Sequence, residues 1–241
     1  LYMNVLDRNI NNIFFIFLIT NLIIWTLVPS LTNKNLPLDT IEALAWGSKL
    51  DWGFNKHPPL SAFFPEIIYQ IFGPQDWAYY LLSQIFISIA FYYTFKFACE
   101  ILENTKLALL SVFLLVSIYF YNFTSPEFNV NVCQIPFWAL VVYFSWKIYS
   151  SKKIKFIDCF LVGLFGALGF LSKYLFIYLL VSIDLLFIYL IFLKKQKKFD
   201  FKYLITIEVF IVLLLPHFIW LYQNDFVTIF YGIKRTGLRK W

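Results

Sequence analysis

Acidic side chains concentrate in one polar segment, residues 32–76, which separates the first two long apolar stretches of the chain. A carboxylate can act as a general base on an acceptor hydroxyl, or it can hold a metal ion that neutralises a phosphate leaving group. Asp39 and Glu42 are three residues apart, so on a helix they would share one face. Ordinary acids on a solvated loop are the alternative interpretation. Five of the chain's fourteen acidic residues lie in this segment: Asp39, Glu42, Asp51, Glu66 and Asp76.

Two short helices are predicted to hold these acids. The stretch that begins at Asp39 and the stretch Leu60–Phe72 both carry apolar residues at helical spacing. Amphipathic helices of this kind lie in the plane of a membrane interface. Gly73 and Pro74 would end the second helix. We therefore expect residues 32–76 to form a structured loop at a membrane surface.

The remaining sequence is typical of a helical membrane protein. Hydrophobic residues make up 61% of the 241 residues, charged residues 14%, and the mean hydropathy is +0.71. A soluble domain is about 45–50% apolar and about 25% charged, so a soluble enzyme and a disordered chain are excluded. Since about 20 apolar residues cross a bilayer, the predicted fold is an all-α transmembrane helix bundle with about seven spans. The expected spans are Ile13–Leu31, Trp77–Phe97, Leu107–Phe123, Val132–Tyr149, Ile157–Leu171, Tyr174–Leu193 and Tyr203–Tyr222.

Basic residues predict the orientation, because Lys and Arg gather on cytoplasmic loops. The densest basic runs follow the fourth and sixth spans, which places the N-terminus in the cytoplasm and residues 32–76 on the exoplasmic side. The net charge of +6 is explained by this topology and does not indicate a nucleic-acid partner. A further basic cluster, on the exoplasmic side, indicates either a phosphate partner or an unstructured end. It consists of Lys234, Arg235, Arg239 and Lys240.

Several short runs carry a resemblance to a known family. Three of them lie in the polar segment: Leu38–Trp46, Leu50–Phe54 and Lys56–Leu60. Their order and spacing resemble the first exoplasmic loop of the polyprenyl-phosphate-sugar-dependent glycosyltransferases. This C-type family includes the protein O-mannosyltransferases and the aminoarabinose–lipid A transferases. Later segments that agree with the family are Pro126–Asn131, Gly166–Tyr174 and Trp220–Phe226.

The resemblance implies a reaction. A sugar would pass, with inversion, from a polyprenyl-phosphate-linked donor to a hydroxyl or phosphate of an exoplasmic or periplasmic acceptor. The acceptor stays open among an envelope glycolipid, a polysaccharide and a protein. Asp39 matches the family's catalytic acid, and Glu42 stands in for a second acid that many relatives carry directly after the first. The residues expected to bind the donor phosphate or the substrate are Lys56, His57, Lys173 and Arg235.

Two of these assignments have alternatives, and a second polar site is also expected. Lys56 could simply face water, and His57 could serve only to orient its turn. Relatives carry another acid where this chain has Asn131, and nearby Glu127 could substitute for it. Because Asn is a weaker ligand than a carboxylate, a divalent metal ion as cofactor stays open.

Length and location complete the expectations. Relatives continue with further spans, so residues 1–241 are expected to form a single transmembrane domain that is truncated at its C-terminal end. The expected location is the bacterial cytoplasmic (inner) membrane, where membrane lipid surrounds the spans. Two alternatives to an active enzyme remain: an inactive truncated transferase, and a carrier such as a lipid-linked sugar translocase or a small-solute transporter.

Polar residues inside the spans are a separate signal, because ionisable groups at that depth face the bundle interior or a cavity. Asp184 is expected either to make an interhelical hydrogen bond or to contribute to a polar path. His217, which follows Pro216, would either point into the catalytic cavity or bond to a neighbouring helix.

Overall fold

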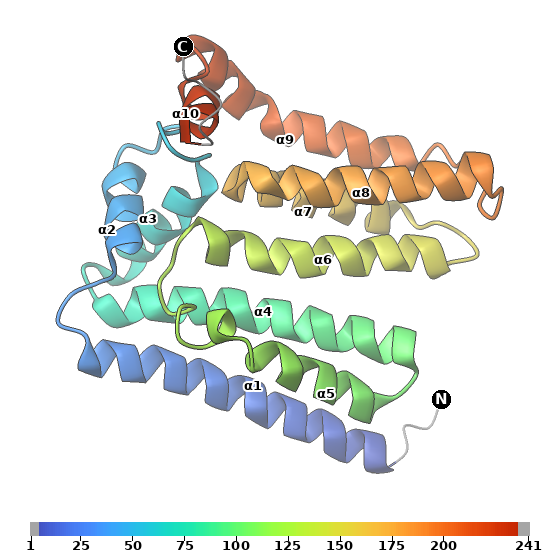
Figure 1. Ribbon diagram of the computed structural model, residues 1–241, viewed down its shortest axis with the longest axis horizontal. Coiled ribbons are helices and arrows are strands. Elements are labelled where there is room, and N and C mark those ends of the chain that lie inside the picture. Colours follow the sequence, from blue (N-terminus) through green and yellow to red (C-terminus); the bar gives the residue numbers. More distant parts are fainter. Residues whose placement is uncertain (1–4, 236–241) are drawn as a thin grey trace.

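The computed structural model describes residues 5–235, which contain ten α-helices and no strand (Figure 1). The predicted all-α class is therefore confirmed. The long helices lie side by side, while α2, α3 and α10 gather at one end of the bundle. The helices are α1 (Val5–Thr32), α2 (Leu38–Gly47), α3 (Leu60–Phe72), α4 (Asp76–Leu102), α5 (Thr105–Val116), α6 (Val130–Ser150), α7 (Phe156–Ser172), α8 (Ile177–Ile188), α9 (Tyr203–Gln223) and α10 (Val227–Arg235). Short 3₁₀ turns at Tyr119–Tyr121 and Tyr174–Phe176 and a π turn at Tyr189–Leu193 complete the described part.

Four helical segments are long and apolar enough to cross a membrane: α1, α4, residues 174–193 and α9. Helices α3, α5 and α7 are apolar but shorter. The span expected at Leu107–Phe123 differs from the structure, since α5 ends at Val116. There the side-chain amide of Asn122 donates to the Val116 carbonyl at 2.8 Å and satisfies this carbonyl at the end of the helix. Hydropathy does not reveal such a helix end.

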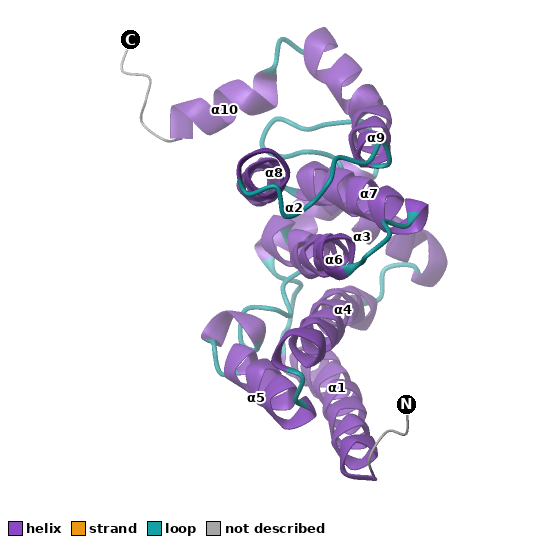
Figure 2. Cartoon of the chain, turned by 90° about the vertical axis from the view of Figure 1, so that its right-hand side faces the viewer, coloured by secondary structure: helices purple, strands orange, loops and turns teal. Residues whose placement is uncertain are grey.

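The core is formed by neighbouring helices in the order α1, α4, α6, α7 and α9, as the end-on view in Figure 2 shows. Lipid is as apolar as these side chains, so close packing holds such helices together. Phe14 of α1 stacks on Phe95 of α4 with ring centroids 4.1 Å apart. Between α7 and α9, the Thr206 hydroxyl donates to the Cys159 carbonyl at 3.0 Å.

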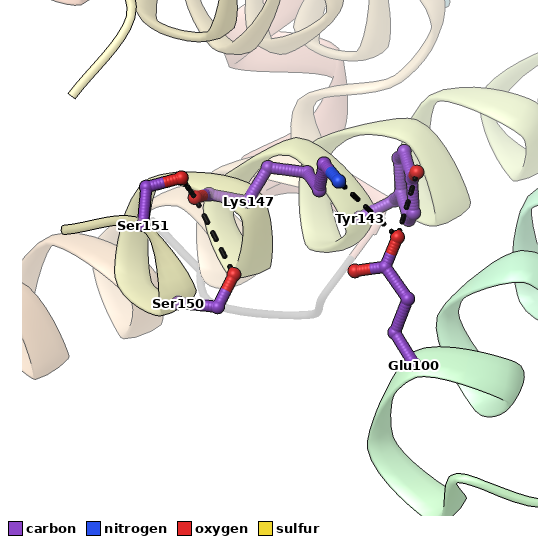
Figure 3. A network of polar contacts seen from close by, with 5 residues as sticks. All are labelled: Glu100, Tyr143, Lys147, Ser150 and Ser151. Atoms are coloured by element: carbon purple, nitrogen blue, oxygen red, sulfur yellow. Dashed lines mark hydrogen bonds and ion pairs between the residues drawn. The ribbon is translucent and has the colours of Figure 1, made fainter. Parts of the chain in front are cut away.

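A polar network joins α4 to α6 at the end of the bundle away from α2 (Figure 3). One carboxylate oxygen of Glu100 accepts from the Tyr143 hydroxyl at 3.1 Å and from the Lys147 amine at 3.3 Å. The Ser151 hydroxyl donates to the Lys147 carbonyl at 2.6 Å, near the C-terminus of α6. These bonds fix the register of the two central helices.

The connecting segments divide between the two ends of the bundle (Figure 1). The turns after α4, α6 and α8 lie at the end where α1 begins, and they include the basic segments 151–155 and 194–202. Residues 33–75 and α10 lie at the opposite end. The segments predicted to be cytoplasmic and those predicted to be exoplasmic are thus separated in space.

The two helices expected in the polar segment are present as α2 and α3. Gly73 ends α3 with φ +70°, a backbone conformation that favours glycine, and its N–H donates to the Tyr69 carbonyl at 2.8 Å. The Thr40 hydroxyl of α2 donates to the Phe128 carbonyl at 3.1 Å, which ties α2 to the segment before α6. The polar segment is therefore a structured part of the molecule.

Candidate active site

A polar cavity of about 830 Å³ lies at the end of the bundle that carries α2 and α10. Its walls come from α2, the 48–59 loop, the start of α6, the residue after α7, and α10. Every site residue expected from sequence lines this cavity except Glu127. The lining residues are Asp39, Glu42, Lys56, His57, Val130, Asn131, Lys173, Tyr231, Lys234 and Arg235.

Asp39 and Glu42 share one face of α2, as their spacing predicts, and both line the cavity. Glu42 forms an ion pair with Lys56, and this hydrogen bond raises the pKa of Lys56 above its ordinary value. The Asp39 carboxylate makes no ion pair with any residue that the structure describes. Of the two acids on this wall, Glu42 is therefore the one engaged in an ion pair.

Glu127 lies beside Asp39 without lining the cavity. Its carboxylate accepts a hydrogen bond from the backbone N–H of Asp39 at 3.2 Å, in the first turn of α2. Burial raises the pKa of Glu127, the Asp39 amide opposes that shift, and the Asp39 charge adds to it. Glu127 therefore supports the start of α2, where a negative group complements the helix dipole.

Basic side chains from α10 and from the residue after α7 form another wall of the cavity. The Lys173 amine donates to the Asn131 side-chain oxygen at 2.5 Å. Burial lowers the pKa of Lys173, and the nearby charge of Arg235 lowers it further. Lys173, Lys234 and Arg235 make no salt bridge within residues 5–235, so their charges are available to an anion.

Asn131 is held in place by the start of α6. The Asn129 side chain caps this helix, because its oxygen accepts from the backbone N–H groups of Asn131 and Val132 at 2.9 and 3.1 Å. This cap points the Asn131 side chain at Lys173. The Asn131 amide oxygen is thus engaged with the Lys173 amine.

His57 is half-buried and lines the cavity between the two walls. Its ring meets Trp46 edge-on with centroids 5.8 Å apart, and its carbonyl accepts from the Phe54 N–H at 3.1 Å. Burial lowers the pKa of His57, and the charge of Lys173 acts in the same direction. The backbone carbonyl of His57 closes the turn and its ring packs on Trp46, which agrees with the orienting role.

Three cavity residues come from α10, a helix that hydropathy does not reveal, and Arg235 is the one of them expected as a site residue. Tyr231 was not expected, and Lys234 was expected only as part of the basic cluster. Tyr231, Lys234 and Arg235 stand at i, i+3 and i+4, so helical periodicity was the signal available for them. Arg239 and Lys240 lie outside the described residues.

A divalent metal ion was left open by the sequence. Among the described residues, no three His, Cys, Asp or Glu side chains gather in a way that could hold one. In the cavity, the Glu42 carboxylate is paired with Lys56, and the Asn131 side-chain oxygen accepts a hydrogen bond from Lys173. These residues do not fit a metal ion, and the reaction below uses none.

The predictions for the two polar residues inside the spans, His217 and Asp184, have different outcomes. His217 makes the interhelical bond that was one of its two expectations, since its Nε2 lies 2.7 Å from the Tyr174 hydroxyl oxygen. Asp184 is exposed on α8 and has no hydrogen-bond partner in the described part of the chain. The prediction of an interhelical hydrogen bond for Asp184 is therefore wrong. It borders an apolar cavity between α8 and α9, at a distance from the polar cavity.

In a comparison with protein families, residues 56–220 match the family described as dolichyl-phosphate-mannose-protein mannosyltransferase. This range covers more than half of the chain and includes Lys56, His57, Asn131 and Lys173. Asp39 and Glu42 precede it, so their place in the site rests on the cavity geometry. No curated protein and no solved structure matches the chain.

Proposed function

Because the chain belongs to the dolichyl-phosphate-mannose-protein mannosyltransferase family, whose members are glycosyltransferases, we propose that it transfers a sugar from a polyprenyl-phosphate donor to an exoplasmic acceptor. The observation that carries this proposal is the cavity with two unlike walls. One wall holds Asp39, an acid without an ion-pair partner among the described residues. The other holds three cations without a carboxylate partner there.

The chemistry follows from this arrangement. Asp39 takes the proton of the acceptor hydroxyl, and the acceptor oxygen forms a bond to the anomeric carbon of the sugar. The bond from that carbon to the phosphate oxygen breaks on the opposite face, so the configuration inverts. The lipid phosphate leaves with the bonding electrons. Lys173, Lys234 and Arg235 stabilise its negative charge.

The remaining residues of the site act on Asp39 and on the shape of the cavity. The Glu42–Lys56 pair connects α2 to the 48–59 loop, and Glu127 secures the first turn of α2. The acceptor is a glycolipid, a polysaccharide or a protein of the cell envelope. The proposed location is the bacterial cytoplasmic membrane, with about seven crossings and the cavity on the exoplasmic side.

The proposal predicts that Asp39→Asn abolishes transfer, because an amide cannot accept the acceptor's proton. Membranes that contain the chain are incubated with radiolabelled polyprenyl-phosphate sugars and a cell-envelope extract, and single-turnover transfer is measured. We expect a loss of about 10²–10⁴-fold, the usual contribution of a general base. Asp51→Asn is the matched control, since Asp51 is an exposed acid of the same loop outside the cavity.

Three outcomes contradict the proposal. Transfer by Asp39→Asn at the wild-type rate would remove Asp39 from the role of base. Movement of labelled donor across sealed vesicles, with no transfer to any acceptor, would favour the translocase alternative. Absence of both activities in a folded, membrane-inserted chain would identify an inactive transferase.

A further inference from the structure

A buried histidine outside the cavity connects two of the segments that line it. His217 of α9 is 0% exposed. Its Nδ1 lies 2.6 Å from the Trp52 carbonyl oxygen, and its Nε2 lies 2.7 Å from the Tyr174 hydroxyl oxygen. A carbonyl can only accept, so Nδ1 carries the proton and donates to Trp52. The unprotonated Nε2 accepts from Tyr174, and both nitrogens of the neutral ring are satisfied.

The two partners do not line the cavity themselves, but each lies close in the chain to residues that do. Tyr174 follows Lys173 directly in the chain. Trp52 opens the turn that leads to Lys56 and His57. The His217 imidazole therefore connects the residue next to Lys173 to the 48–59 loop, which carries Lys56 and His57.

Further contacts dock the same turn on α9 and α10. A Cβ atom at Gly53 would lie 2.3 Å from the Trp220 ring, so only glycine allows this close approach. Trp220 in turn lies parallel to the His217 ring, with centroids 6.3 Å apart. The Thr228 hydroxyl of α10 donates to the Phe54 carbonyl at 2.6 Å. The backbone of residues 52–54, which forms no helix, is thus held from outside.

We propose that His217 is a positioning residue for the transferase: its neutral imidazole holds the Trp52 turn against Tyr174 and so sets Lys56 and His57 relative to Lys173. This inference rests on the function proposed above. His217 does not line the cavity and acts through its two partners. Small displacements of groups that bind and orient a substrate lower the rate strongly, so loss of these two bonds reduces transfer.

The kinetic test compares His217→Leu with His217→Gln. Leucine fills space without either bond, whereas a glutamine amide can donate to Trp52 and accept from Tyr174. At a temperature where all variants are folded, we expect His217→Leu to lose at least about tenfold in kcat/KM for the donor and His217→Gln to recover most of it. Tyr174→Phe combined with His217→Leu should be no worse than His217→Leu alone, since the two residues act together.

The structural test needs no activity. Hydrogen exchange of peptides from residues 48–59 reports whether the turn is held, and peptides from α4 serve as the internal control. We expect faster exchange in His217→Leu than in the wild type and in His217→Gln, with α4 unchanged.

The two tests separate the two proposals. If the wild-type chain transfers no sugar, the proposed function fails, while hydrogen exchange still decides whether His217 holds the turn. Wild-type kinetics in His217→Leu would overturn the positioning role. The same holds if His217→Gln is as impaired as His217→Leu, because restoring the two hydrogen bonds would then not restore the rate.

Discussion

At the scale of single residues, Lys173 is a cavity cation whose surroundings lower its pKa. It is half-buried beside Arg235, and both burial and that neighbouring charge lower its pKa from the ordinary 10.5. An anionic donor phosphate binds the protonated amine. As pH rises, Lys173 therefore loses its charge earlier than an ordinary lysine, and donor affinity falls with it.

The prediction for Lys173 concerns the alkaline side of the pH profile. The KM for the donor should rise as pH rises through the lowered pKa of Lys173. Lys173→Arg should move that rise to higher pH, because a guanidinium stays charged. Lys173→Met should raise KM about tenfold, or about 1.4 kcal/mol, at neutral pH. Lys195→Arg, at the opposite end of the bundle, is the control, and identical profiles for the wild type and Lys173→Arg would contradict the assignment.

The sequence predicts these residues to different extents. Asp39 and Glu42 could be placed on one face from local spacing alone. Lys173 and Asn131 lie 42 positions apart, and only the resemblance placed both in one site. Tyr231 was missed because helical periodicity can place it on one face with Lys234 and Arg235, but only the tertiary position of α10 brings that face to the cavity.

At the scale of elements, the 48–59 loop depends on its contact with α9. Gly53→Ala should destabilise the protein by about 1–3 kcal/mol, the usual cost of overpacking, because the new Cβ meets the Trp220 ring. Thermal unfolding in detergent, followed by tryptophan fluorescence, measures the change. Gly232→Ala is the matched control, since a Cβ there meets nothing within 4 Å and alanine favours the α10 helix. Equal shifts in both variants would show that the loop contact does not limit stability.

The bounds of a helix could be predicted where they depend on the local sequence pattern. The bounds of α3 follow from its apolar face and from the Gly73-Pro74 stop. The end of α5 does not, because hydropathy continues through Phe123 while the Asn122 side chain already satisfies the Val116 carbonyl. The helical form of α10 was not expected either, since its basic residues also suit an unstructured end.

At the scale of the whole molecule, the two ends of the bundle carry different chemistry. The basic turns 151–155 and 194–202 lie at one end, and the segments that line the polar cavity, among them α2 and α10, lie at the other (Figure 1). Helix α5, with 12 residues, is about 18 Å long, short of a hydrocarbon core of about 30 Å. The 117–129 segment continues from α5 to the cavity end, so α5 and this segment together complete one passage through the bundle. The chain therefore alternates between ends as seven crossings require.

This alternation leads to a topological prediction. Because Lys-rich loops stay in the cytoplasm, Lys34→Cys should react with a membrane-impermeant maleimide in intact cells, whereas Lys153→Cys should react only after permeabilisation. Both positions are exposed and both changes remove one lysine, so the pair is matched, and the chain without an added cysteine gives the background from its own thiols. The reverse pattern would place Asp39 and the cationic wall in the cytoplasm, where an exoplasmic acceptor could not reach them. Labelling of both positions in intact cells would instead mean that the two ends share one side, which the arrangement of the helices forbids for a spanning bundle.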